Sequence, residues 1–155
     1  MDAVLKANGQ QKDLIYPLAG HVTIDGGAPN LGKGRLRMVV LLYDLAKPDA
    51  VPEKWPSAQV EPSGDFQFSH YGVGDGVAPG NYVFVFTLLT DHKKKGLLGP
   101  DQLKNLYNDP AVNENKEGFK IEHKAPGKRD YQIDLVTAGQ EEATPGPKAV
   151  TRLRD

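Results

Sequence analysis

The 155-residue sequence contains no cysteine. This absence excludes thiol nucleophiles, disulfides, thiolate zinc sites and iron–sulfur clusters together. A chain of this length is expected to form one domain and to bury a core without such crosslinks. The absence of cysteine does not decide between a cytoplasmic and an exported protein, because an exported bacterial domain of this size does not need disulfides.

An excess of charge of one sign is also lacking, since 19 basic residues stand against 20 acidic residues and the formal net charge is -1. Domains that bind nucleic acids usually carry a basic excess that neutralises phosphates. The densest basic cluster here is the lysine run 93–95, which is typical of a solvated turn after a strand. We therefore expect no nucleic-acid partner.

Long apolar runs are absent as well. The longest ones, Met38–Tyr43 and Tyr82–Phe86, fall far short of the roughly 20 residues that a membrane-spanning helix needs, so we expect no transmembrane segment. Residues 1–13, MDAVLKANGQQKD, have neither the apolar centre nor the small-residue cleavage site of a signal peptide. This N-terminal extension is therefore either a native cytoplasmic start or the start of a mature domain behind an added methionine.

Turn-forming residues are plentiful by contrast. The 17 glycines and 12 prolines fall mainly between short apolar runs, and this spacing is typical of an all-β sandwich or barrel. The run Met38–Tyr43 is apolar on both faces, as expected of a central strand that is covered on each side. In the segment 81–90 we assign the even-numbered residues Tyr82 to Leu88 to the core. Seven strands are predicted, in residues 18–24, 34–45, 57–60, 65–69, 81–90, 118–124 and 129–135.

One segment interrupts the succession of strands. In LLGPDQLKNLYNDP, Leu103, Leu106 and Tyr107 recur at helical spacing after Pro100, which predicts a short helix over residues 100–107. The sandwich domain is expected to span residues 14–138. Residues 139–155 contain two prolines and no sustained period, so we expect a mobile or loosely packed tail.

Several short motifs carry a resemblance to a known family: GHVTIDG near the start, GDFQFS, GDGVA followed by PGNY, and LYNDP with a PGKRDYQIDL ending. The chain resembles the transthyretin-like, carboxypeptidase regulatory-like β-sandwich domains, and within them the small exported or lipid-anchored bacterial proteins. The resemblance covers about residues 18–138 and rests on turn and strand motifs. It implies a seven-stranded, immunoglobulin-like antiparallel sandwich, usually non-catalytic, that works in the periplasm or cell envelope. A lipid-accepting cysteine is missing here.

Metal ligation is not expected. The four histidines are widely separated in the chain: His21, His70, His92 and His123. A zinc site assembled from distant strands remains an alternative, and so does weak binding of a hard cation by Asn113, Glu114 and Asn115. The sequence predicts no metal and no cofactor.

Catalysis is not expected either. Ser57, Ser63 and Ser69 lie outside any GxSxG motif. The transthyretin fold also includes a hydrolase of the purine pathway that ends in tyrosine-arginine-glycine-serine, whereas this sequence ends in TRLRD. We therefore predict that the protein is not an enzyme.

The stretch YGVGDGVAPGNYVFVF raises the question of a phosphate-binding loop. Gly72, Gly74 and Gly76 are followed by Val77 where a dinucleotide motif needs glycine, and the stretch leads into a strand. Phosphate loops lead into a helix whose N-terminal N–H groups meet the anion. These glycines are therefore interpreted as a connection and turn.

A candidate binding surface follows from the order of the strands. If consecutive strands run antiparallel, the proline-rich loop with Trp55, the glycine-rich loop with His70, Tyr71 and Asp75, and the turn 125–129 share one end of the sandwich. Trp55 and Tyr71 could form an aromatic platform for a sugar, or Trp55 could cap the open end of the core. We predict an exported module with a structural or protein-interaction role. A carbohydrate-binding module that uses these aromatic residues is the alternative.

Overall fold

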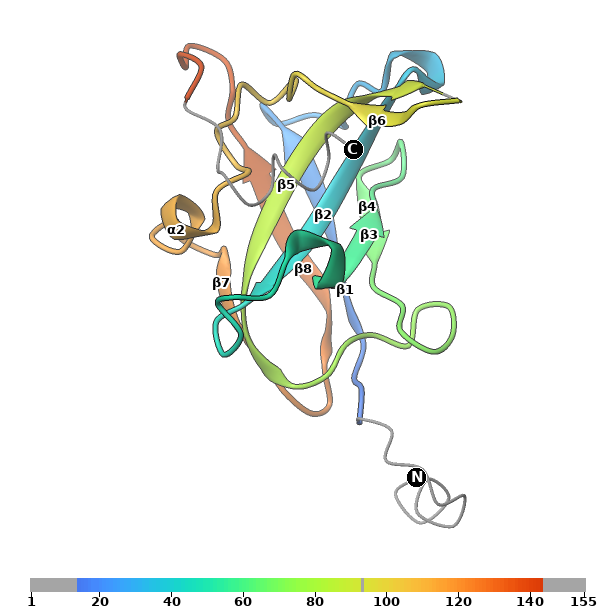
Figure 1. Ribbon diagram of the computed structural model, residues 1–155, viewed down its shortest axis with the longest axis vertical. Coiled ribbons are helices and arrows are strands. Elements are labelled where there is room, and N and C mark those ends of the chain that lie inside the picture. Colours follow the sequence, from blue (N-terminus) through green and yellow to red (C-terminus); the bar gives the residue numbers. More distant parts are fainter. Residues whose placement is uncertain (1–13, 93, 144–155) are drawn as a thin grey trace.

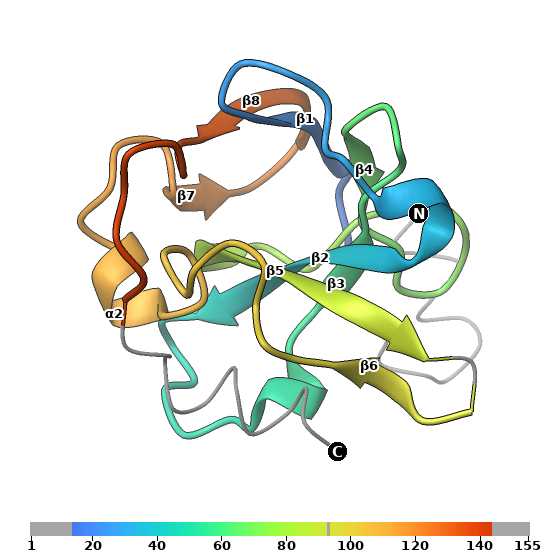
Figure 2. The ribbon, with the colours of Figure 1, turned by 90° about the horizontal axis from the view of Figure 1, so that it is seen from above.

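The computed structural model describes residues 14–92 and 94–143 of the chain, and the predicted extension 1–13 lies outside these residues. They form an all-β, sandwich-like fold in which two sheets face each other (Figures 1 and 2). Within the described residues no helix is long and apolar enough to cross a membrane. The strands are β1 (Leu18–Ile24), β2 (Leu36–Asp44), β3 (Ser57–Gln59), β4 (Asp65–Gln67), β5 (Gly80–His92), β6 (Gly96–Leu98), β7 (Lys120–His123) and β8 (Lys128–Leu135).

The smaller sheet has the strand order β4-β1-β8. Strand β1 alternates as its sequence predicts, because Leu18, Gly20 and Val22 are buried whereas the residues between them are partly exposed. It pairs antiparallel with β4 and parallel with β8. The parallel pair differs from the purely antiparallel sandwich that we predicted. It is possible because almost the whole chain separates the two strands, so that no short turn forces them to run in opposite directions.

The larger sheet has the order β3-β2-β5-β6, and β7 also pairs with β5. Strand β2 pairs antiparallel with β5 from Leu36 opposite Thr90 to Asp44 opposite Tyr82. Its apolar run is buried on both faces, as the sequence predicts. The even-numbered residues of β2 contact the main core, whereas Val39 and Leu41 pack in a second cluster on the outer face of the sheet.

The main core lies between the sheets and is rich in aromatic rings. Phe66 of β4 packs edge to face against Phe84 and Phe86 of β5, with ring centroids 6.0 and 6.5 Å apart. The predicted inward face of β5 is confirmed, since Tyr82, Phe84, Phe86 and Leu88 all belong to this core. Edge-to-face aromatic pairs add to the free energy gained from burying apolar surface.

The strand count and the helix differ from the prediction. Eight strands are present in the described residues, because the short strand β6 was not predicted. Residues 100–107 form turns, and the helix α2 begins later, at Pro110–Asn113. Lys104 and Asn105 have φ angles of 59° and 57°, in the left-handed region that a right-handed helix cannot contain. The predicted helix over 100–107 is therefore wrong.

Between β6 and β7 the edge of β5 is completed by an irregular segment instead of a strand, through both backbone groups and side chains. The carboxylate of Asp101 accepts the backbone N–H of Leu88 at 2.9 Å. The amide of Asn113 donates to the carbonyl oxygen of Phe84 at 2.9 Å. The backbone groups of β5 are buried here, so each needs such a partner. Leu103, Leu106 and Tyr107, whose spacing suggested a helix, belong instead to an irregular segment that packs along this edge.

Candidate functional site

The three connections that were predicted to share one end of the sandwich do so. The β2–β3, β4–β5 and β7–β8 connections all lie in the lower half of the molecule in Figure 1. Residues 69–76 of the β4–β5 connection, here called the glycine loop, contain three of the predicted site residues. Loops at one end of a sandwich are where such folds commonly carry recognition residues.

Asp75 holds the glycine loop together from within. One oxygen of its carboxylate accepts the backbone N–H of His70 at 2.7 Å. The other oxygen accepts the N–H groups of Tyr71 and Gly72 at 2.9 and 2.7 Å. Desolvation raises the pKa of Asp75, but the hydrogen bonds from these N–H groups outweigh it, so that the pKa lies below its ordinary value. Asp75 therefore positions the loop and is not a free ligand-binding group.

The loop has two further constraints. The hydroxyl of Ser69 accepts the N–H of Gly74 at 2.8 Å, which closes the loop across its width. Gly76 has a φ of 110°, and a Cβ at this position would overlap the carbonyl oxygen of Tyr16. Gly74 also has a positive φ, of 71°, so both glycines are needed for the backbone conformation, as the interpretation of the stretch as a turn requires.

The glycine loop, held by Asp75 and Ser69, presents aromatic and apolar side chains to solvent. Val73 at its tip is 91% exposed and Tyr71 is 50% exposed. The rings of His70 and Tyr71 pack edge to face, with their centroids 4.3 Å apart. A hydrogen-bonded loop with exposed apolar side chains is a preformed contact surface.

Trp55 does not join this surface. It is only 5% exposed and packs on the outer face of the larger sheet with Val39, Leu41 and Val85. Its indole N–H donates to the carbonyl oxygen of Ala50 at 3.1 Å. The predicted sugar platform of Trp55 and Tyr71 is therefore not formed. The predicted cap on the open end of the core is also corrected, because Trp55 covers a sheet face instead.

The histidines contact different parts of the structure. His21 lies 2.9 Å from the carboxylate of Asp65, and His123 donates from Nε2 to the carbonyl oxygen of Tyr16 at 2.9 Å. The structure brings no three His, Cys, Asp or Glu side chains together as a metal site within residues 14–92 and 94–143. The alternative zinc site finds no support in this arrangement.

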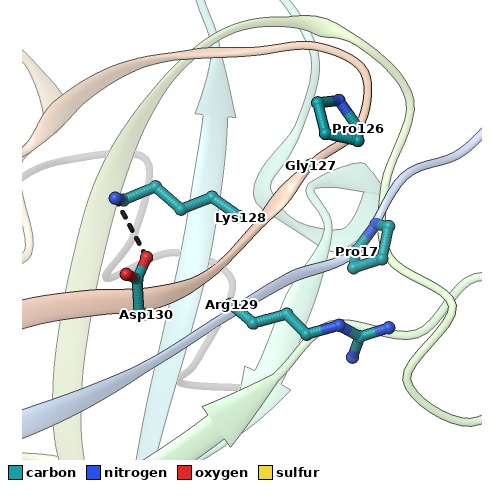
Figure 3. Close-up of a pocket in the computed structure, with 6 residues that line it drawn as sticks. All are labelled: Pro17, Pro126, Gly127, Lys128, Arg129 and Asp130. Carbon is teal, nitrogen blue, oxygen red and sulfur yellow. Dashed lines mark ion pairs between the residues drawn. The ribbon is translucent and has the colours of Figure 1, made fainter.

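A hollow of about 680 Å³ lies beside the start of β8, where Pro17 meets the turn before Lys128 (Figure 3). The ammonium group of Lys128 pairs with Asp130 at 3.0 Å, and this hydrogen bond lowers the pKa of Asp130 and raises that of Lys128. Arg129 points to the other side of the strand. Both members of the ion pair are exposed, so the pair adds little to stability.

Arg129 also lines a second hollow, of about 490 Å³, which we call the β4 groove. The groove follows β4 and reaches the glycine loop at Ser69. Its lining residues are Ala19, Gly20, Gln59, Glu61, Asp65, Phe66, Gln67, Ser69 and Arg129. None of these polar residues was predicted as a binding residue from the sequence. The alternation of Asp65, Gln67 and Ser69 around Phe66 and Phe68 was the available indication, because it places the three polar side chains on one exposed face.

Comparison of the chain with protein-family models, with curated proteins and with solved structures finds no match.

Proposed function

We propose that this chain is a non-catalytic, transthyretin-like sandwich module that binds another protein of the bacterial cell envelope through its glycine loop. The observation that carries the proposal is that this loop combines exposed side chains with a hydrogen-bonded backbone. Tyr71 and Val73 are exposed, while Asp75 and Ser69 hold the backbone beneath them. A preorganised loop loses little conformational entropy on binding, and tyrosine is enriched among the residues that dominate interface energies.

The family and the location belong to the same proposal. They are supported by the turn and strand motifs GHVTIDG, GDFQFS and GDGVAPGNY and by the two-sheet, sandwich-like fold in which these motifs lie. Fractionation of cells that carry the gene tests the location. We expect the protein in the periplasmic or envelope fraction, and recovery only with the cytoplasmic proteins would overturn this part.

Site-specific photocrosslinking tests the binding surface. A photoreactive amino acid in place of Val73 should capture one defined partner in the native cells. The same group in place of Val112, a valine that is 50% exposed and lies on α2, is the control and should not capture it. Equal capture from both positions would contradict a role for the loop.

The captured partner then allows an affinity measurement. Tyr71→Ala and Val73→Ser should each weaken binding at least about tenfold, because each removes apolar contact area, whereas Val112→Ser should leave it unchanged. Asp75→Ala should weaken binding as well, because it releases the backbone N–H groups of the loop while leaving the contacting side chains in place. Unchanged affinity in all three loop variants would overturn the proposal.

A further inference from the structure

We propose that the β4 groove is a binding site for a neutral saccharide, whose hydroxyl groups are contacted by Gln59, Glu61, Gln67 and Arg129. This site lies beyond the loop contact proposed above and uses different residues. It also differs from the aromatic platform predicted from the sequence, because Trp55 takes no part in it.

The first argument is the availability of the polar groups. Gln59, Glu61, Gln67 and Arg129 are exposed, and their side chains form no hydrogen bond or ion pair with other residues in the described part of the chain. Together they offer amide and guanidinium donors beside amide and carboxylate acceptors. A sugar hydroxyl is both a donor and an acceptor, so a lining of mixed polarity suits it.

The second argument is the charge of the lining, which disfavours an anionic ligand. Glu61 and Arg129 oppose each other in sign, and the remaining carboxylate, Asp65, is already engaged within the protein. Its two oxygens contact His21 at 2.9 Å and Ser63 at 3.0 Å. These hydrogen bonds, that from His21 first, lower the pKa of Asp65. With Asp65 ionised, the lining carries two carboxylates and one guanidinium, so an anion would find no surplus of positive charge here.

The third argument is the position of the groove beside the glycine loop. Gly74 lies so close to the side chain of Gln67 that a Cβ at Gly74 would be 2.8 Å from Oε1 of Gln67. The loop and the groove therefore form one continuous surface.

The volume is consistent with a small ligand. At about 490 Å³ the groove lies within the range of roughly 300–1,000 Å³ that is usual for small-molecule sites. Its lining is more polar than that of most such sites, which favours a ligand rich in hydroxyl groups over an apolar one. An extended groove also accepts a short chain of sugar rings.

Titration followed by NMR tests the site on the full chain. Isotope-labelled protein is titrated with maltotriose, cellotriose and triacetylchitotriose up to about 10 mM, which detects dissociation constants in the millimolar range. We expect at least one trisaccharide to shift the side-chain amide signals of Gln59 and Gln67 and the backbone signals of Asp65 and Ser69. Shifts confined to other regions, or no shifts with any of the three sugars, would overturn the proposal.

Substitutions separate the groove from the loop. Gln67→Ala and Arg129→Ala should each lower the affinity for the trisaccharide at least about fivefold, because each removes hydrogen bonds to the ligand. Gln102→Ala and Arg35→Ala are exposed controls outside the groove and should change nothing. Val73→Ser, which tests the protein contact, should leave saccharide binding intact. Equal affinity in the groove variants and the controls would refute the assignment.

Competition and salt distinguish a saccharide from an anion. Binding of a neutral sugar should not change between low and high sodium chloride, because no net charge is neutralised. Inorganic phosphate should not displace the sugar. If phosphate shifts the same signals and binds with higher affinity than any trisaccharide, Arg129 belongs to an anion site and the saccharide proposal fails.

Discussion

At the scale of single residues, Gly76 combines two requirements that only glycine meets. Its φ of 110° lies in a region that other residues rarely adopt, and a Cβ would overlap the carbonyl oxygen of Tyr16. Gly26 has a φ of 82° but open space around it. We expect Gly26→Ala to cost about 1 kcal/mol of unfolding free energy and Gly76→Ala about 3 kcal/mol. Urea denaturation measures both, and equal costs would show that the overlap with Tyr16 contributes nothing.

Thr87 offers the opposite case, in which a substitution should stabilise the protein. Its side chain is buried on the outer face of β5, opposite Val39, and its hydroxyl has no hydrogen-bond partner among the described residues. Thr87→Val keeps the shape and removes the unpaired hydroxyl, so the unfolding free energy should rise by about 1 kcal/mol. The partly exposed Thr90 is the control, and Thr90→Val should stay within about 0.5 kcal/mol. Thermal and urea denaturation check both, and a loss of stability in Thr87→Val would contradict the expectation.

At the scale of elements, Asp101 replaces a missing strand along β5. Its carboxylate accepts the N–H groups of Leu88 and Leu103 at 2.9 and 3.1 Å. Burial raises the pKa of Asp101 above its ordinary value of 3.8, and this effect exceeds the lowering by the backbone N–H groups. The folded protein therefore holds this proton more tightly than the unfolded chain. Its contribution to stability is greatest below 3.8 and is lost as the pH rises through the raised pKa.

Asp101→Asn isolates this pH dependence. Asparagine cannot ionise but keeps one acceptor oxygen, so wild type should lose stability relative to Asp101→Asn between about pH 4 and pH 7. Urea denaturation at both pH values measures the difference. Asp101→Ala leaves both N–H groups without an acceptor and should cost about 2 kcal/mol at either pH. A difference between wild type and Asp101→Asn that does not change with pH would refute the assignment.

At the scale of the whole molecule, residues 16 and 17 tie the two sheets together at one end. Tyr16 and Val77 exchange backbone hydrogen bonds of 3.0 and 3.1 Å, and the carbonyl oxygen of Pro17 accepts the N–H of Lys128 at 2.9 Å. The buried His123 also donates to Tyr16. A short segment before β1 thus contacts the β4–β5 connection, β7 and β8.

Truncation tests the importance of this segment. A chain that begins at Leu18 should lose about 3 kcal/mol of stability, because it lacks these hydrogen bonds and leaves His123 without its acceptor. The amides of Val77 and Lys128 should exchange with solvent at least about 100-fold faster. A chain that begins at Leu14 retains the contacts and is the control. Hydrogen exchange that is equally slow in both chains would show that the segment is not what closes this end.

The faces of the strands could be predicted from the sequence. Alternation placed Tyr82, Phe84, Phe86 and Leu88 of β5 in the core, where the structure has them. The prediction succeeds because successive side chains of a strand point to opposite faces, so that the pattern of burial follows from the order of neighbouring residues. The family, the location and the partner remain predictions from the sequence motifs.

Other features depended on which distant segments meet. The spacing of Leu103, Leu106 and Tyr107 fits a helix, yet left-handed residues at 104 and 105 break it so that Asp101 and Tyr107 reach the edge of β5. Pairing with a distant strand outweighs a weak local preference for helix. Residues 139–143 of the predicted tail likewise contact Lys104, whose ammonium group donates to the carbonyl oxygen of Gln140. The rest of that tail lies outside the described residues.

By itself, then, the sequence determined the all-β class, the inward faces of the strands and the turn at the glycine loop, because each follows from a local pattern of two to four residues. The tertiary structure alone decided that Trp55 covers a sheet face, that Asp75 holds the backbone of the glycine loop and that Arg129 and Gln67 line one groove. These arrangements join residues that are far apart in the chain. No local pattern encodes such contacts, since they depend on how the two sheets pack and on where the loops between them end.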